Sequence, residues 1–225
     1  MRRGIRDAGL SLAFLVFFVL ALLGQSIAGH AYLNEQQAQH GDAKVGYLEY
    51  VSSSDFIVDV AENWQSEFLQ FFLFILATIW LVQRGSPESK QPGDEGVGTD
   101  VEQSVGRHAR ADSPKWAKSR GIRLWVYSNS LLLVMGGVFL ASWLAQSIAG
   151  RVVANEEGAQ HGQPPATWVE YVVSADFWNR SLQNWQSEFL AVGAMVVFSI
   201  YLRQRGSSES KPVGVPHRTS SVEAD

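Results

Sequence analysis

The sequence contains no cysteine among its 225 residues. A disulfide framework, a thiolate nucleophile and a cysteine-bound zinc site are therefore excluded. The formal net charge is −4, so the chain also lacks the basic excess typical of nucleic-acid-binding proteins, and we expect no nucleic-acid partner. Charged residues make up 18% of the chain and hydrophobic residues 46%, so the way the two kinds are distributed decides the class of protein.

Motifs of catalysis are missing as well. The sequence has no HExxH zinc motif, no glycine-rich phosphate-binding loop and no nucleotide-binding fingerprint. It also has no recognisable motif for a serine, histidine and acid triad. We therefore expect a protein that is not an enzyme, with no catalytic residue and no cofactor.

Two copies of one unit follow each other along the chain. The block Asn-Trp-Gln-Ser-Glu-Phe-Leu at Asn63–Leu69 returns unchanged at Asn184–Leu190. The block Gln-Arg-Gly-Ser-x-Glu-Ser-Lys at Gln83–Lys90 returns at Gln204–Lys211, and the matches align without a gap, which indicates an internal repeat. The expected parts are a first two-helix membrane repeat at 1–90, a disordered cytoplasmic linker at 91–120, a second two-helix membrane repeat at 121–211 and a disordered cytoplasmic tail at 212–225.

Four apolar runs without charge predict four transmembrane helices. The runs are Leu10–Gly29, Phe68–Gln83, Leu124–Gly150 and Phe189–Leu202. A helix needs about 20 apolar residues to cross the hydrocarbon core, and the two shorter runs reach that length by extending back toward Asn63 and Asn184. No proline interrupts any run. The expected fold class is an all-α integral membrane protein.

A secretory signal peptide is the alternative for the first run. Arg2, Arg3 and Arg6 would form its basic start, and Gly29-His30-Ala31, with small residues at its first and third positions, would form a cleavage site. The matching run in the second half is internal and cannot be a cleaved leader. This match favours a retained transmembrane helix.

Lysine and arginine residues near the ends of the runs set the orientation. One side of the membrane holds only Lys44, Arg151 and Arg180. The other side holds the lysine and arginine residues of the N-terminal segment, the linker and the helix exits. We therefore expect both termini and the central linker in the cytoplasm, in a multi-pass protein of the plasma membrane whose first partner is the lipid bilayer. Both repeats then cross in the same direction, as parallel repeats related by an axis along the membrane normal.

Small helical caps are expected on the outer side. The first helix should continue to His40 and stop at Gly41, and a short helix should cover 46–51. A second long helix is predicted over Phe56–Gln83, after an N-cap within 52–55. On the cytoplasmic side, the basic segment Pro114–Arg123 of the linker is expected to contact anionic lipid.

Small residues spaced four apart predict where the helices pack closely in lipid. They are Gly24, Ala28, Gly137, Ala141, Ala145 and Ala149. Polar side chains near the outer membrane boundary form the best candidate binding cluster. Its members are Glu35, His40, Asn63, Glu67, Glu156, His161, Asn184 and Glu188.

The polar cluster has two interpretations. Carboxylates and imidazoles meeting at an axis could bind a divalent cation or move protons. The favoured interpretation is that they satisfy helix ends, bridge loops or face water, so no metal site is assigned.

The repeated Asn-Trp-Gln-Ser-Glu-Phe-Leu and Gln-Arg-Gly-Ser-x-Glu-Ser-Lys blocks resemble an uncharacterised family of bacterial integral membrane proteins, known only as a domain of unknown function. The resemblance covers both repeats and implies a bacterial inner membrane, without catalytic residues. Together with the uncharged membrane cores, it favours a non-enzymatic structural or interaction component with unidentified protein partners. The alternatives are a small-solute or ion conduit along the repeat axis, and a metal- or proton-responsive membrane sensor.

Overall fold

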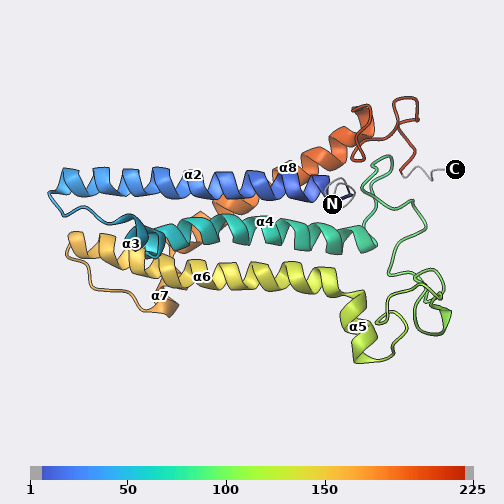
Figure 1. Cartoon of the computed structure of the whole chain (residues 1–225), viewed down its shortest axis with the longest axis horizontal. Helices are drawn as coiled ribbons and strands as arrows, with labels where there is room; N and C mark the ends of the chain where they lie inside the picture. Colours follow the sequence, from blue (N-terminus) through green and yellow to red (C-terminus); the bar gives the residue numbers. More distant parts are fainter. Residues whose placement is uncertain (1–6, 221–225) are drawn as a thin grey trace. The chain divides into compact units, whose positions relative to one another are not determined.

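The computed structural model describes residues 7–220, and these residues form seven α-helices, one short 3-10 helix and no strand (Figure 1). The expected all-α class is thus confirmed. The predictions for Arg2, Arg3, Arg6 and the last five residues of the tail lie outside the described residues. The helices are α2 (Gly9–His40), α3 (Tyr47–Val51), α4 (Ser54–Trp80), α5 (Ile122–Ser128), α6 (Ser130–Gln160), α7 (Trp168–Val172) and α8 (Ala175–Tyr201), with the 3-10 helix η1 at Gly106–His108.

Two of the helices in the described part of the chain, α2 and α6, are long and apolar enough to cross a membrane. On α2 the large apolar side chains stand exposed, with Phe14 64%, Phe17 63% and Leu20 62% accessible. Helices α4 and α8 do not pass the same test; polar residues such as Asn63, Gln65, Asn184 and Gln186 lie among their apolar ones.

Helix α2 ends where the sequence predicts. Gly41 adopts a left-handed conformation with φ of 80°, and its N–H donates to the carbonyl of Ala38. The next N–H, of Asp42, donates to the carbonyl of Gln37 at 2.8 Å. These bonds satisfy the last carbonyls of the helix, and glycine adopts the required φ without strain. The short helix predicted at 46–51 is α3.

Two predicted helix boundaries are wrong. Helix α4 begins at Ser54 and ends at Trp80, not at Gln83, because the backbone N–H of Gln83 is bound by the Ser89 hydroxyl at 2.7 Å in the turn that follows. The run Leu124–Gly150 is not one helix. Asn129 separates α5 from α6, and its side chain donates to the carbonyl of Trp125 at 2.8 Å. Such local side-chain bonds compete with helical ones and end the first helix.

The chain divides into two compact units, each of which contains segments from both halves of the sequence. The first unit comprises the chain up to Val60 together with Ala145–Tyr171. The second comprises Ala61–Leu144 and the chain from Val172 onward. In the first unit α3 packs against α2.

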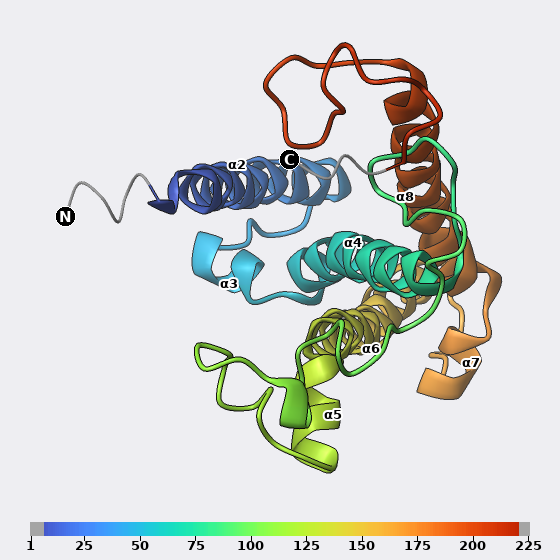
Figure 2. The ribbon, with the colours of Figure 1, turned by 90° about the vertical axis from the view of Figure 1, so that its right-hand side faces the viewer.

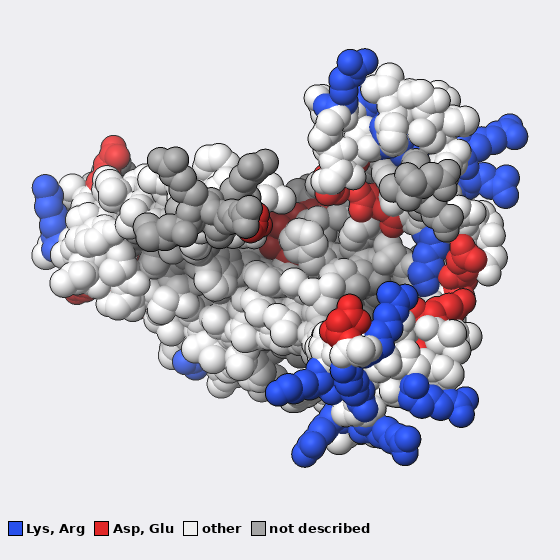
Figure 3. Space-filling model, turned by 45° about the vertical axis from the view of Figure 1, so that its right-hand side comes forward, with Lys and Arg blue, Asp and Glu red and all other residues white. Residues whose placement is uncertain are grey.

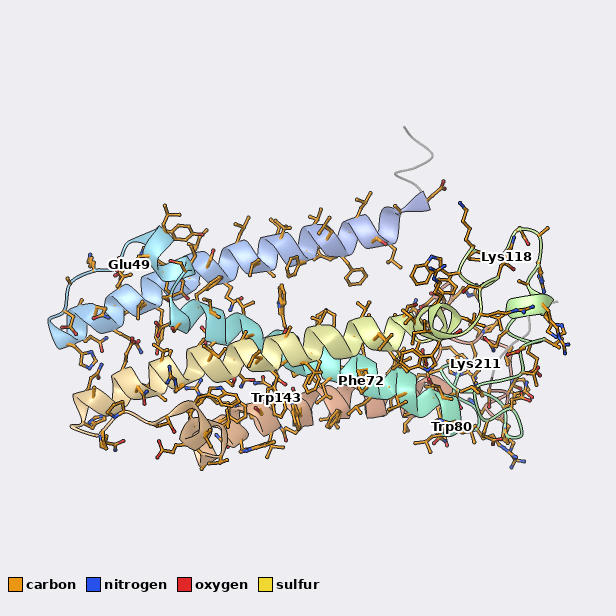
Figure 4. All side chains as sticks on the ribbon, turned by 90° about the horizontal axis from the view of Figure 1, so that it is seen from below. Glu49, Phe72, Trp80, Lys118, Trp143 and Lys211 are labelled. Carbon is orange, nitrogen blue, oxygen red and sulfur yellow. The ribbon has the colours of Figure 1, made fainter. Side chains whose placement is uncertain are left out.

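In the second unit the C-terminal part of α4 packs with α8 and the N-terminal part of α6. Trp185 on α8 donates its Nε1–H to Gln65 Oε1 on α4 at 2.7 Å. Trp143 on α6 contacts the ring of Trp185, with the ring centroids 5.9 Å apart. Phe72 on α4 lies against Gly136, where an added Cβ would sit 3.1 Å from the ring. Phe72 and Trp143 are labelled in Figure 4. The tightest helix packing of this unit therefore uses aromatic rings.

Two segments without α-helix follow α4 and α8 in the second unit, at 81–121 and 202–220 (Figure 2). The first contains turns and η1, and Gly96 lies against the ring of Trp80. The Gly106 N–H donates to the carbonyl of Ala117 at 2.8 Å. Disorder of the linker and tail stays a prediction.

Candidate functional site

Equivalent residues of the two halves anchor the loops of the first unit in the same way. The Ser26 hydroxyl is bonded to the hydroxyl of Tyr47 at 2.8 Å. In the second half, the Ser147 hydroxyl accepts from Trp168 Nε1–H at 3.0 Å. Each bond ties the first turn of a short helix, α3 or α7, to the long helix before it. The sequence indicates the serines through their repetition, but gives no sign of their partners.

A second pair of anchors uses asparagine. The Asn34 side chain accepts from the Val45 N–H at 2.7 Å and donates to the Val45 carbonyl at 3.1 Å. Asn155 makes the same two bonds to Ala166, at 2.8 and 3.1 Å. A primary amide can bond both the N–H and the C=O of one residue. Each asparagine therefore holds the loop after Gly41 or Gly162 to its helix. These asparagines were not among the predicted site residues.

The third contact found in both halves is between a glycine of the long helix and a tyrosine of the short helix. A Cβ added at Gly29 would overlap the hydroxyl of Tyr50, and one at Gly150 would overlap that of Tyr171. Both tyrosines are buried. Burial, followed by the charges of Asp59 and Asp55, raises the pKa of Tyr50 above its ordinary value, so this hydroxyl stays protonated.

Most residues of the predicted small-residue packing face have no close neighbour among the described residues, so helix packing through them stays a prediction. Gly24, Ala28, Gly137 and Ala141 are exposed, and a Cβ at either glycine would meet no atom within 4 Å. Ala145 is half-buried and Ala149 is buried. The glycines that do have close neighbours are Gly29 on α2 and Gly136 and Gly150 on α6. They lie within about one or two turns of the predicted residues.

An acidic pocket of about 540 Å³ lies in the first unit, between the C-terminal ends of α2 and α6 and the loops that follow α2 and α3. Its lining includes His40, whose Nδ1 is bonded to the carbonyl of Gln36 at 2.9 Å, but neither lysine nor arginine. The carboxylates that line it are Asp42, Glu49, Asp55, Glu156 and Glu157. Figure 4 labels Glu49, on α3.

The eight residues of the predicted polar cluster are divided between the two units. His40 and Glu156 line the acidic pocket, whereas Glu35 and His161 do not and are exposed. In the second unit, Asn184 Nδ2–H donates to the Arg180 carbonyl of its own helix at 3.0 Å.

The other members of the cluster also lie in the second unit. The carbonyl of Asn63 accepts from the hydroxyl of Ser66 at 2.9 Å. Glu67 and Glu188 lie close enough to interact electrostatically. Within the described residues, no three histidine, aspartate or glutamate side chains form a group that could hold a metal ion.

Buried glutamines are polar features that the sequence reasoning missed. Gln65 and Gln146 are both 0% exposed. Gln65 accepts the bond from Trp185 through Oε1, but its Nε2 has no hydrogen-bond partner within residues 7–220. Both amide atoms of Gln146, in α6, are without a partner among the described residues. An unsatisfied buried amide costs about 1–3 kcal/mol, so each of these side chains lowers the stability of the fold unless a ligand or water binds it.

The exit motifs of the two halves form the same turn in the second unit. The Gln83 N–H donates to Ser89 Oγ at 2.7 Å, and the Gln204 N–H donates to Ser210 Oγ at 2.9 Å. Gly85 and Gly206 occupy the same place in the motif and have φ values of 92° and 86°. The repeated serine and glycine residues of the motif are thus explained by backbone geometry.

The two exit motifs also meet. The carboxyl groups of Glu88 and Glu209 lie close enough to interact electrostatically. Burial, followed by the charge of Glu209, raises the pKa of Glu88 above its ordinary value. Lys211, 2% exposed, donates its ammonium protons to the carbonyls of Gly85, His217 and Thr219. Burial, followed by the charge of Arg203, lowers the pKa of Lys211.

Comparison with the curated proteins and with the solved structures finds no match. Among protein families, the model described as "Domain of unknown function (DUF6766)" matches residues 1–222. The match spans nearly all of the chain, including both exit motifs and the acidic pocket, and the chain therefore belongs to this family.

Proposed function

We propose that this chain is a four-span protein of the bacterial inner membrane and acts there as a non-enzymatic structural or interaction component. The observation that carries the proposal is the exposed apolar surface of α2, which needs lipid around it. The C-terminal halves of α4 and α8 add exposed aromatic side chains, among them Phe71, Phe189 and Phe198. These halves supply the third and fourth spans.

Equivalent ends of the two halves lie together, which supports parallel repeats. In the first unit, the C-terminal ends of α2 and α6 line one pocket. In the second unit, the two exit motifs contact each other through Glu88 and Glu209. An inverted repeat would separate such ends across the membrane. The termini and the connecting segment then face the cytoplasm, because lysine and arginine concentrate there.

The contacts of the repeated residues favour a structural role over a chemical one. Serine, asparagine and glycine residues of both halves bind loops to helices or form tight turns, as the Asn34, Asn155 and Gly85 geometries illustrate. Each duplicated contact has a packing or hydrogen-bonding purpose. A protein whose repeated residues hold its own loops is suited to present a fixed surface.

A conduit for water or a small polar solute is the second candidate, and Gln146 favours it. Its side chain is fully buried and its amide is unpartnered within a candidate membrane span. A passing water or polar solute would satisfy this amide. The acidic pocket at the end of α6 would favour cations.

Flux through proteoliposomes separates the two functions. The structural role predicts that protein-containing vesicles leak K⁺ and a small polar solute no faster than empty ones. It also predicts no change with Glu67→Gln, Glu188→Gln or Gln146→Leu. A flux that falls in these variants, but not in Gln186→Leu at an exposed glutamine or Glu102→Gln in the connecting segment, would replace the structural role with the conduit.

A further inference from the structure

A second pocket, of about 380 Å³, lies in the second unit beside the exit of α4. We call it the arginine pocket, because the charged residues in its lining are Arg84 and Arg218. The remaining lining residues are Gln91, Pro92, Thr219 and Ser220. We propose that the arginine pocket binds a phosphate group, carried either by a lipid headgroup or by a soluble phosphate compound.

The lining has the chemistry of an anion site. Two guanidinium groups supply paired donors, and Gln91 and Thr219 add neutral donors. No carboxylate lines the pocket, and neither arginine forms an ion pair in the described part of the chain. Guanidinium groups bind phosphate oxygens in pairs, through two parallel N–H bonds.

The pocket is held open by bonds that do not use its arginines. The Gly85 N–H donates to Ser220 Oγ at 2.9 Å, which fixes the C-terminal segment beside Arg84. Lys211 binds the Thr219 carbonyl at 3.1 Å and that of Gly85. The two arginines are therefore brought together by backbone contacts, so their side chains remain available for a ligand.

The electrostatic surroundings favour an anion as well. The buried Lys211 donates only to carbonyls and has no carboxylate partner among the described residues, so its charge is not neutralised. Figure 4 shows Lys211 among the segments that follow α4 and α8. Figure 3 shows blue lysine and arginine side chains gathered over this part of the second unit. A phosphate beside Lys211 would offset that charge.

The test uses the full chain in an uncharged detergent. Inorganic phosphate is titrated against thermal unfolding, with chloride at equal ionic strength as the reference. In a second arm, bound lipid is measured by native mass spectrometry after addition of phosphatidylglycerol or phosphatidylcholine. We expect Arg84→Gln with Arg218→Gln to weaken binding of the favoured probe at least about tenfold, since charge-assisted hydrogen bonds are lost.

Matched controls remove the same charge outside the pocket. They are Arg205→Gln, the counterpart of Arg84 in the second exit motif, and the pair Arg107→Gln with Arg110→Gln in the connecting segment. If the double variant does not fold, Arg84→Lys and Arg218→Lys keep the charge but lose the bidentate geometry, and each should still weaken binding.

Saturable binding of inorganic phosphate that the pocket variants lose identifies a soluble phosphate compound as the ligand class. Selective retention of phosphatidylglycerol, without phosphate binding, identifies a lipid headgroup. Either result, with the controls unchanged, supports the proposal. Absence of binding in both arms, or equal weakening in the pocket and control variants, overturns it.

Discussion

Glycine and tyrosine make the closest contact between elements of the first unit. Gly29 and Gly150 lie directly against the hydroxyls of Tyr50 and Tyr171, so no larger residue fits without movement. Gly24, on the same helix as Gly29, has open space around it. The absence of a side chain is therefore required at Gly29 but not at Gly24, and only the tertiary structure distinguishes the two positions.

Replacing Gly29 with alanine should destabilise the protein by about 1–3 kcal/mol, because the new methyl group overlaps the tyrosine hydroxyl. The free energy of unfolding in detergent measures the effect. Gly24→Ala is the matched control and should be neutral or stabilising by up to about 1 kcal/mol, through helix propensity. Tyr50→Phe should restore part of the loss in the double variant. Equal effects at Gly24 and Gly29 would show that the contact does not exist.

Asparagine anchors offer a second test. Asn34→Ala removes two hydrogen bonds to Val45, each worth about 0.5–1.5 kcal/mol. We expect faster hydrogen exchange at the Val45 amide, with a matching effect at Ala166 in Asn155→Ala. Gln39→Ala, at an exposed position of the same helix, is the control. Unchanged exchange at Val45 would remove the anchor from the account.

At the scale of elements, the helix ends show which boundaries a sequence pattern can predict. The stop at Gly41 follows from a local rule, and so does the cap of α8 by Ser174, whose hydroxyl accepts the Phe177 N–H at 3.2 Å. The break at Asn129 was missed, because the apolar run continues across it and its cause is one side-chain bond. The early end of α4 depends on Ser89, beyond the apolar run.

The candidate site was predictable only in its composition. The repeats indicated which polar residues to consider, and His40 and Glu156 do line one pocket. Their distribution over two units, and the pairing of Glu88 with Glu209, depend on tertiary contacts that no local pattern contains. Lys211 was predicted to lie near a helix exit, but a buried lysine bonded only to carbonyls has no sequence signal.

The contact between the exit motifs should depend on pH. The pKa of Glu88 is raised in the folded state above the ordinary 4.5, so its contribution to stability is full at low pH and is lost as the pH rises through the folded-state pKa. Glu88→Gln mimics the protonated form, so we expect a higher melting temperature than wild type at pH 7–8 and little difference near pH 4.

The control for this prediction is Glu102, whose pKa is shifted in the opposite direction. The Thr99 N–H donates to Glu102 at 2.7 Å, and this bond, followed by that of the Thr99 hydroxyl, lowers the pKa of Glu102. Glu102→Gln should therefore lower the melting temperature at neutral pH, with the difference vanishing as the pH falls through the folded-state pKa. A Glu88→Gln variant that is less stable than wild type at pH 8 would contradict the raised pKa of Glu88.

At the scale of the whole molecule, the account depends on the two halves crossing the membrane in the same direction. Each unit contains equivalent segments from both halves, namely the ends of α2 and α6 in the first and the exit motifs in the second. The proposed cytoplasmic side carries the connecting segment and the arginine pocket. In the proposed topology, the loops that line the acidic pocket face the other side of the membrane.

Single-cysteine labelling in intact cells tests the arrangement most directly, because the chain has no cysteine of its own to give a background signal. With a membrane-impermeant maleimide, Lys44→Cys and Gln163→Cys should react from outside the inner membrane. Thr99→Cys and Ser208→Cys should react only after that membrane is permeabilised. If the residues at 44 and 163, or those at 99 and 208, fall on different sides, the four-span parallel topology is contradicted.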